Sequence, residues 1–260
     1  MRFSILGSGS KGNCTLVEAG STRVLIDNGF SAKELIRRLG QLDVAPESLT
    51  AIVLTHEHDD HIKGAGVLAR RLNLPVYANA PTLRAAEPRM GHLPAAHEFG
   101  TGETFAIQGL EIHPFAISHD TADPVGFVFG DGESRLGYCT DTGIITRLIR
   151  HHLQTCQALI LEANHDIGMV KNGPYPLPLK QRVLSSRGHL ANGDSLSLAA
   201  ELAGASLGLL ILAHLSEVNN HPQLVRDEVQ AHLHGSSPLR VLLAEQHQAS
   251  PLLEISSDRG

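Results

Sequence analysis

Short hydrophobic runs, separated by glycine, proline, asparagine or serine, fill the first half of the chain. Runs with such boundaries are typical of β-strands, and several alternate polar and hydrophobic positions as half-buried strands do. The pattern predicts strands at residues 2–6, 14–19, 22–27, 51–55, 75–79, 104–108, 110–118, 125–130 and 135–140.

Helical spacing of hydrophobic residues lies between and after these runs. Ser31, for example, is a candidate N-cap for a helix over residues 31–40. Residues 171–180, rich in proline and glycine, are expected to form a loop that leads into a helix. The spacing predicts helices at 31–40, 60–72, 144–153, 176–187, 194–205 and 222–233, and closing strands at 207–214, 239–246 and 250–257.

The order of these elements, many strands and then alternating helices and strands, predicts an α/β fold. Two β-sheets with helices on their outer faces suit this order. The chain has 260 residues, enough for one large hydrophobic core, and it shows no linker, low-complexity segment or internal repeat. We therefore expect one domain over residues 1–260.

Charge limits the ways in which the protein could bind nucleic acid. The formal net charge is -6, whereas a protein that binds nucleic acid through a broad surface is expected to be basic. Any contact with nucleic acid should therefore be confined to one groove. The 16 histidines are a first, weak indication of metal chemistry.

The compartment is predicted from two observations. The first residues, MRFSILGSGSKGN, do not resemble a signal peptide, and no hydrophobic run has the length of a membrane span. The three cysteines are odd in number and lack C-x-x-C spacing, which argues against a disulfide framework or a cysteine zinc site. We expect a cytoplasmic protein that has no contact with a membrane.

Gly7, Gly9 and Gly12 spell the G-x-G-x-x-G pattern of dinucleotide-binding proteins directly after a predicted strand. That function requires a helix next, because the helix N-terminus holds the pyrophosphate. A strand pattern follows instead. We therefore interpret the glycines as a tight turn between two strands.

The sequence THEHDDH at residues 55–61, which follows a predicted strand, contains the strongest candidates for metal ligands. His56 and His58 are two residues apart, so in an extended segment they point to the same side. Asp60 and His61 begin the next helix, which turns them back toward the same point. A solvated loop would explain a lone His-x-His, but ligand type, number and context here favour two adjacent metal ions.

This string resembles the signature of the metallo-β-lactamase superfamily, and the resemblance covers nearly the whole chain. It implies an αββα sandwich in which two mixed β-sheets carry helices on their outer faces. It also implies that His56, His58 and His119 hold one metal. Asp60, His61 and His214 would hold the other, and Asp141 would join the two. Asp27 in LIDNG resembles a supporting acid near the site.

Two further residues resemble catalytic groups of the tRNA-maturing ribonucleases in this superfamily. His189 follows Gly188 before a predicted helix, and it matches a histidine that contacts the scissile phosphate or protonates the leaving oxygen. Glu162 in LEANHD would orient His189. A phosphoryl transition state needs such a positive or proton-donating group opposite the metals. Together with Asp60, these residues form the predicted catalytic set.

A closer resemblance is to bacterial DNA exonucleases of the superfamily, through GSGSKGNC, SHDTADPVGF, CTDTG, EANHD, GHLAN and AHLSEVNN. It implies a 5′-to-3′ DNA exonuclease linked to DNA repair, with two divalent ions (Zn²⁺ or Mn²⁺, with iron a third candidate) and a homodimer as one arrangement. Candidate substrate-binding residues are Asn13, Asn164 and Asn192, with Asn219 nearby. Candidate phosphate contacts are Lys11, Lys63, Lys171, Lys180, Arg182 and Arg187.

Three alternatives stay open at this point. The same fold could hydrolyse a small phosphodiester, a thioester or a lactam, because function depends on the site and not on the fold. A regulatory protein that binds metal without catalysis is a second alternative, although the intact ligand set argues against it. A di-iron redox protein is the third, but such members carry an acid where this chain has His58.

Overall fold

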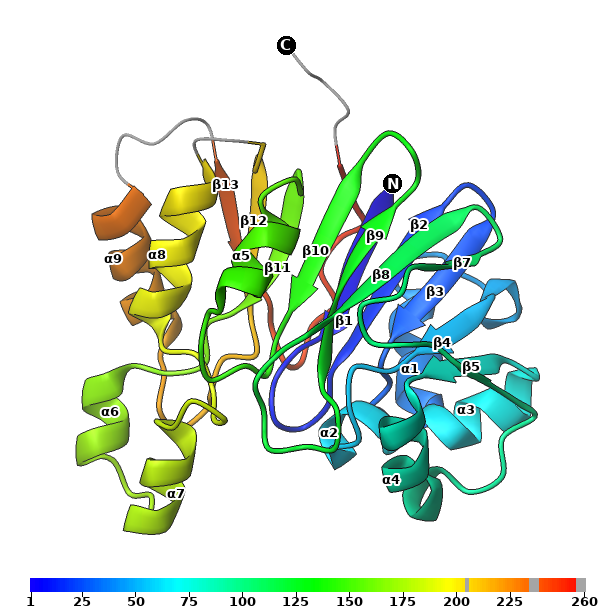
Figure 1. Cartoon of the computed structure of the whole chain (residues 1–260), viewed down its shortest axis with the longest axis horizontal. Helices are drawn as coiled ribbons and strands as arrows, with labels where there is room; N and C mark the ends of the chain where they lie inside the picture. Colours follow the sequence, from blue (N-terminus) through cyan, green and yellow to red (C-terminus); the bar gives the residue numbers. More distant parts are fainter. Residues whose placement is uncertain (204–205, 234–238, 256–260) are drawn as a thin grey trace.

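The computed structural model describes residues 1–203, 206–233 and 239–255 and contains two seven-stranded β-sheets (Figure 1). The first sheet has the strand order β14-β1-β2-β3-β4-β5-β6. Its pairs are antiparallel from β14 to β3 and parallel from β3 to β6. The strands are β1 (Arg2–Gly7), β2 (Cys14–Ala19), β3 (Thr22–Ile26), β4 (Ala51–Val53), β5 (Pro75–Ala78), β6 (Ala95–Glu98) and β14 (Leu253–Glu254).

The second sheet has the order β13-β12-β11-β10-β9-β8-β7. It is parallel from β13 to β10 and antiparallel from β10 to β7. Both sheets are therefore mixed, as predicted. The strands are β7 (Phe105–Ile107), β8 (Leu110–Ala116), β9 (Val125–Gly130), β10 (Arg135–Cys139), β11 (Ala158–Glu162), β12 (Leu209–Ala213) and β13 (Arg240–Leu243).

Helices cover the outer face of each sheet (Figure 1). On the first sheet lie α1 (Ala32–Gly40), α2 (Asp59–Ile62), α3 (Ala65–Leu72) and α4 (Ala80–Met90). On the second lie α5 (Arg147–Leu153), α8 (Asn192–Ala203) and α9 (Pro222–Leu233). Two short helices, α6 (Ile167–Asn172) and α7 (Leu177–Val183), extend beyond the second sheet (Figure 1).

Three hydrophobic layers hold the sandwich together. The central layer packs the inner faces of the two sheets against each other, with Phe3 from one sheet and Phe127 from the other, both completely buried. A second layer joins the first sheet to α1, α3 and α4, and a third joins the second sheet to α5, α8 and α9. Burial of this hydrophobic surface is the main driving force for folding. The predicted αββα sandwich is confirmed.

Most predicted elements are present, with shifted ends. Ser31 caps α1 as expected, since its side chain accepts a hydrogen bond from the backbone N–H of Glu34. The glycine turn is also confirmed, because β2 follows Gly12 and both Gly9 and Gly12 have positive φ angles. Residues 204, 205, 256 and 257, which end two predicted elements, lie outside the described residues.

Two predicted elements differ in the structure, and further elements were missed. The helix predicted at 60–72 is broken into α2 and α3, and Gly64 is the N-cap of α3. A Cβ atom at Gly64 would overlap the carbonyl oxygen of Phe30, so the chain turns where no side chain fits. The predicted strand 250–257 is reduced to β14. Helices α4 and α6 and strand β6 were missed, and Pro88 in the interior of α4 is a residue that disfavours helices.

Within the described residues, no helix combines the length and the hydrophobicity that a membrane crossing requires.

Candidate metal centre

The candidate ligands lie just beyond strand ends on one edge of the sandwich. Asp27 follows β3, Asp141 lies two residues beyond β10, and His214 follows β12. All three have positive φ angles, 58°, 59° and 56°, although none is a glycine. Non-glycine residues adopt this conformation at an energetic cost, and such residues gather at functional sites. These loops therefore keep a backbone conformation that costs energy but places the three side chains in the site.

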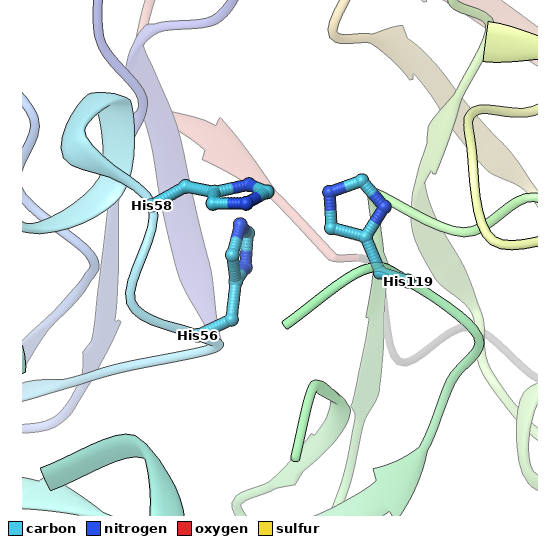
Figure 2. Close-up of side chains that lie close together, drawn as sticks. All are labelled: His56, His58 and His119. Carbon is cyan, nitrogen blue, oxygen red and sulfur yellow. The ribbon is translucent and has the colours of Figure 1, made fainter. Parts of the chain in front are cut away.

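The first candidate group contains His56, His58 and His119, whose ligand atoms all lie within 4.8 Å of one another. His56 and His58 come from the extended segment between β4 and α2, and His119 comes from the loop after β8. Figure 2 shows the three rings turned toward a common point from these two sides. The ring centroid of His58 lies 4.9 Å from that of His56 and 5.0 Å from that of His119.

The second candidate group contains Asp60, His61 and His214, again within 4.8 Å of one another. Asp141 lies between the groups. One of its oxygens is 3.4 Å from His61 Nε2, and it also groups with His56 and His61 as potential ligands. The structure therefore brings together all seven residues that the sequence nominated as ligands, in the two groups expected, with Asp141 shared.

The Nδ1 atoms of four candidate-ligand histidines, His56, His61, His119 and His214, lie within hydrogen-bond distance of an oxygen. His61 Nδ1 donates to Asp27 Oδ2 over 2.7 Å, and His119 Nδ1 donates to the carbonyl oxygen of Gly188 over 2.9 Å. Thr55 Oγ1 donates to the same Asp27 oxygen and lies 2.9 Å from His56 Nδ1. A histidine with Nδ1 bonded in this way presents a lone pair on Nε2, which is the form that binds metal.

Several buried atoms of the site have no hydrogen-bond partner among the described residues. Such atoms are rare in folded proteins, because each one left unsatisfied costs about 1–3 kcal/mol. Imidazole nitrogens and carboxylate oxygens are ligands for divalent zinc, manganese and iron. The residues therefore fit divalent cations. The unpartnered atoms are His56 Nε2, His119 Nε2, His214 Nε2 and Asp141 Oδ2.

Electrostatics also favour cations in the site. Burial lowers the pKa of His56 well below its usual value. Burial also lowers the pKa of His61, but the surrounding carboxylates, Asp141 foremost, outweigh it and raise that pKa to about 9. Burial is outweighed in the same way at His214, whose pKa is raised well above its usual value by Asp141 and other carboxylates. The carboxylates thus create a negative potential that either protons or metal ions can offset.

His189 and Glu162 form a pair beside Asp141. Glu162 is completely buried at the end of β11, and its Oε1 accepts from His189 Nδ1 over 2.9 Å. The same oxygen accepts from His214 Nδ1 over 2.8 Å, a contact that sequence analysis missed. Burial lowers the pKa of His189, but the charge of Glu162 outweighs it and raises that pKa. His189, whose side chain is partly exposed, can therefore carry a proton.

A groove opens over this edge. His58, Asp60, Asp141, His189 and His214 lie in its floor and walls. Tyr175, Leu179 and Arg182 line it from α7 and the loop before α7. The segment after β12 lines the other side through Leu215, Ser216, Glu217, Val218 and Asn219. Members of both candidate metal groups thus face this groove.

The predicted substrate-binding asparagines are placed differently from one another. Asn164 lines the groove, where its side chain also donates to the carbonyl oxygen of His214. Asn13 is buried, and its amide donates to Asp60 Oδ2 over 3.1 Å, so it positions a candidate ligand. Asn192 is buried against Asn220. The structure therefore leaves only Asn164 of the three facing the groove.

The six basic candidates are also separated by the structure. Of these six described residues, only Arg182 lines the groove. Lys11 is paired with Glu217, and Arg187 lies 3.4 Å from the carbonyl oxygen of His119. Lys63 lines a different hollow beside Phe30. Lys180 donates to the carbonyl oxygen of Lys171 on the exposed side of α6.

Comparison with known proteins agrees with this fold and site. The family model described as Beta-lactamase superfamily domain matches residues 22–215. Exodeoxyribonuclease YycJ of Bacillus anthracis is 36% identical over 231 residues, which cover 88% of each chain. Exodeoxyribonuclease WalJ of Streptococcus pneumoniae is 35% identical over 263 aligned residues, which cover 98% of each chain. The chain belongs to the beta-lactamase superfamily.

Solved structures show the same fold. The metallo-beta-lactamase fold protein YhfI of Bacillus subtilis superimposes with a TM-score of 0.72 at 18% identity, over 96% of this chain and 98% of that one. The short form of human tRNase Z superimposes with a TM-score of 0.68 at 17% identity, over 98% of this chain and 100% of that one. The chain therefore has the metallo-β-lactamase fold.

Proposed function

We propose that the protein is a metal-dependent phosphodiesterase that degrades DNA from the 5′ end as an exonuclease. The observation that carries this proposal is the pair of ligand groups that share Asp141 and lie beside His189 at the bottom of one groove. Two adjacent divalent ions suit an in-line displacement at phosphorus, because they stabilise both the attacking and the leaving oxygen.

The two ions would be Zn²⁺ or Mn²⁺, with iron a third candidate, as the nitrogen and oxygen ligands suggest. His56, His58 and His119 would hold one ion, and Asp60, His61 and His214 the other, with Asp141 shared. When bound, the ions would lower the pKa of a water molecule and neutralise charge on the phosphate. Asp27, Thr55 and Gly188 would keep the histidine rings in the orientation that presents Nε2.

His189 and Glu162 would supply the acid. Because Glu162 holds His189 Nδ1, the Nε2 atom is left to act on substrate. The raised pKa of His189 favours the protonated ring, which can stabilise a phosphoryl oxygen and donate a proton to the leaving oxygen. Glu162 would act through His189 and would not contact the phosphate.

DNA as the substrate is supported by two observations. The relatives named exodeoxyribonuclease match along most of their own length as well as this chain's. The net charge of -6 disfavours a broad nucleic-acid surface, whereas a groove lined by Arg182 can take the end of a strand. A role in DNA repair, a cytoplasmic location and a homodimer stay predictions of the family resemblance.

The test uses single- and double-stranded DNA labelled at either the 5′ or the 3′ end, with RNA of the same sequence, after loading with Mn²⁺ or Zn²⁺. We expect metal-dependent release of short labelled products from the 5′ end of DNA. Asp60→Ala, which removes a candidate ligand, should release none. If no polymer is degraded while bis-p-nitrophenyl phosphate is hydrolysed, the protein is a small-phosphodiester hydrolase instead.

A further inference from the structure

Asp120, which sequence analysis gave no role, lies between the first histidine group and Arg182. Its Oδ1 atom is 3.6 Å from His119 Nε2 and 3.9 Å from His58 Nε2. Its Oδ2 atom accepts from Arg182 Nε over 2.6 Å. One carboxylate therefore separates the guanidinium of Arg182 from the candidate metal site.

This ion pair differs from an ordinary surface pair. Exposed pairs contribute about 0–1 kcal/mol and have no particular orientation. Here Asp120 Oδ1 is buried and makes no hydrogen bond to any residue that the structure describes, so the carboxylate is held in a position that stability alone does not explain. Its neighbour His119 is a candidate ligand, so the backbone at Asp120 is fixed together with the site.

Arg182 has donors to spare. Only its Nε atom bonds to Asp120, and its two terminal Nη groups make no hydrogen bond within the described part of the chain. The side chain is 52% exposed and lines the groove. A guanidinium with free Nη groups can donate hydrogen bonds to two oxygens of one phosphate at once.

The helix that carries Arg182 is anchored to the catalytic loop. The backbone N–H of His189 donates to the carbonyl oxygen of Val183, in the last turn of α7. A Cβ atom at Gly188 would overlap the carbonyl oxygens of Arg182 and Val183, so only glycine permits this close approach. The backbone of Arg182 is thus held close to that of His189.

We infer that Arg182 is a phosphate-binding residue of the groove and that Asp120 is the residue that positions it relative to the first histidine group. The phosphate is one of the DNA backbone, so this inference rests on the proposed function. Asp120 acts through Arg182 and is a positioning residue. Arg182 binds substrate, and a loss of its charge should weaken binding more than it slows the chemical step.

The test compares Arg182→Gln, Asp120→Asn and the double variant with the unsubstituted protein, using 5′-labelled DNA and zinc-loaded enzyme. Arg150→Gln is the matched control, because Arg150 forms a similar exposed pair with Glu201 away from the groove. We expect Arg182→Gln to raise KM by about 10-fold or more, the usual effect of losing a charged hydrogen bond, with kcat nearly unchanged. The slope of log KM against log salt concentration should also fall by the amount expected for about one phosphate contact.

Two further results complete the expectation. Asp120→Asn should raise KM in the same way while bound zinc, measured by atomic emission, stays at the unsubstituted level. The double variant should be no worse than Arg182→Gln alone, because both changes remove the same contact. Arg150→Gln should match the unsubstituted protein.

Different outcomes separate the two claims. If the unsubstituted protein degrades DNA and Arg182→Gln leaves KM unchanged, the role of Arg182 is wrong and the proposed function stands. If Asp120→Asn loses zinc with KM unchanged, Asp120 is a ligand and not a positioning residue. If the unsubstituted protein degrades no DNA, the proposed function fails, and the inference fails with it.

Discussion

One carboxylate, Glu162, accepts hydrogen bonds from two histidines of the candidate site. Its Oε1 accepts from both His189 and His214, and its Oε2 accepts from the backbone N–H groups of Thr142 and Leu190. A completely buried carboxylate is tolerated when it is hydrogen-bonded in this way. The charge of Glu162 therefore acts on both His189, the proposed proton donor, and His214, a candidate ligand.

The role of His189 gives the first prediction. His189→Asn removes the proton donor but leaves the candidate ligands in place, so kcat on DNA should fall by about 10²–10⁴-fold. Zinc content, measured by atomic emission, should not change. His151→Asn is the control, since His151 is exposed on α5 and should keep full activity. Full turnover by His189→Asn would show that another group protonates the leaving oxygen.

At the scale of elements, the loop after β3 fixes the ligand string. The backbone N–H of Asn28 donates to the carbonyl oxygen of His61, and the backbone N–H of Asn13 donates to that of Asp60. Gly29 packs directly on the Asp60 carbonyl, where a Cβ atom would overlap it. The turn before β2 and the loop after β3, both far from α2 in sequence, thus hold α2 in place.

The second prediction follows from this packing. Gly29→Ala should force α2 outward, lower stability by about 1–3 kcal/mol and reduce zinc content, because Asp60 and His61 shift together. Thermal unfolding and metal analysis measure the two effects. Gly40→Ala is the control, since a Cβ atom there meets nothing and Gly40 lies in α1, so Tm should stay or rise slightly. Unchanged zinc content and Tm in Gly29→Ala would contradict the packing argument.

Elements also show what the sequence could and could not predict. Strands and layers could be predicted from hydrophobic periodicity, and four candidate ligands from the short string at residues 55–61. The other three, His119, Asp141 and His214, were implied only by the family resemblance. The break between α2 and α3 could not be predicted, since the hydrophobic spacing continues from Ile62 to Leu68 and only the carbonyl of Phe30 excludes a side chain at Gly64.

Contacts between distant segments were equally hidden. The bond from His214 to Glu162 depends on the register of β11 and β12, which pairs Glu162 with Ala213 and so brings the next residue beside it. The buried partners of Asn13 and Asn192 depend on tertiary packing in the same way. A polar residue near a motif could be a substrate contact or a structural one, and only its neighbours decide which.

At the scale of the whole molecule, the two sheets meet at an edge that concentrates negative charge. Asp27, Asp141 and Glu162 come from strand ends on both sheets, and Asp60 comes from α2. Protonation of neighbouring histidines such as His61, whose pKa is raised to about 9, offsets part of this charge. Bound ions would join the two halves of the sandwich, so they should stabilise the fold as well as support catalysis.

The third prediction tests that coupling. Removal of metal with a chelator should lower Tm, and zinc at about 100 times its Kd should restore about 2.7 kcal/mol, or roughly 5–10 °C. Differential scanning calorimetry measures the shift. Asp141→Asn should lose most of this zinc-induced rise in Tm. The variant should still fold, because asparagine tolerates the positive φ at this position. An equal zinc-induced shift in Asp141→Asn would mean that Asp141 is not a ligand.

The number of ions that activity requires tests the central claim most directly. Metal-free protein would be titrated with Mn²⁺ or Zn²⁺ while bound metal and the release of 5′-labelled DNA products are recorded on the same samples. We expect two ions per chain at saturation, and product release that rises with the second equivalent. Full DNA degradation with one ion, or with none, would contradict a two-metal site built on His56, His58, Asp60, His61, His119, Asp141 and His214.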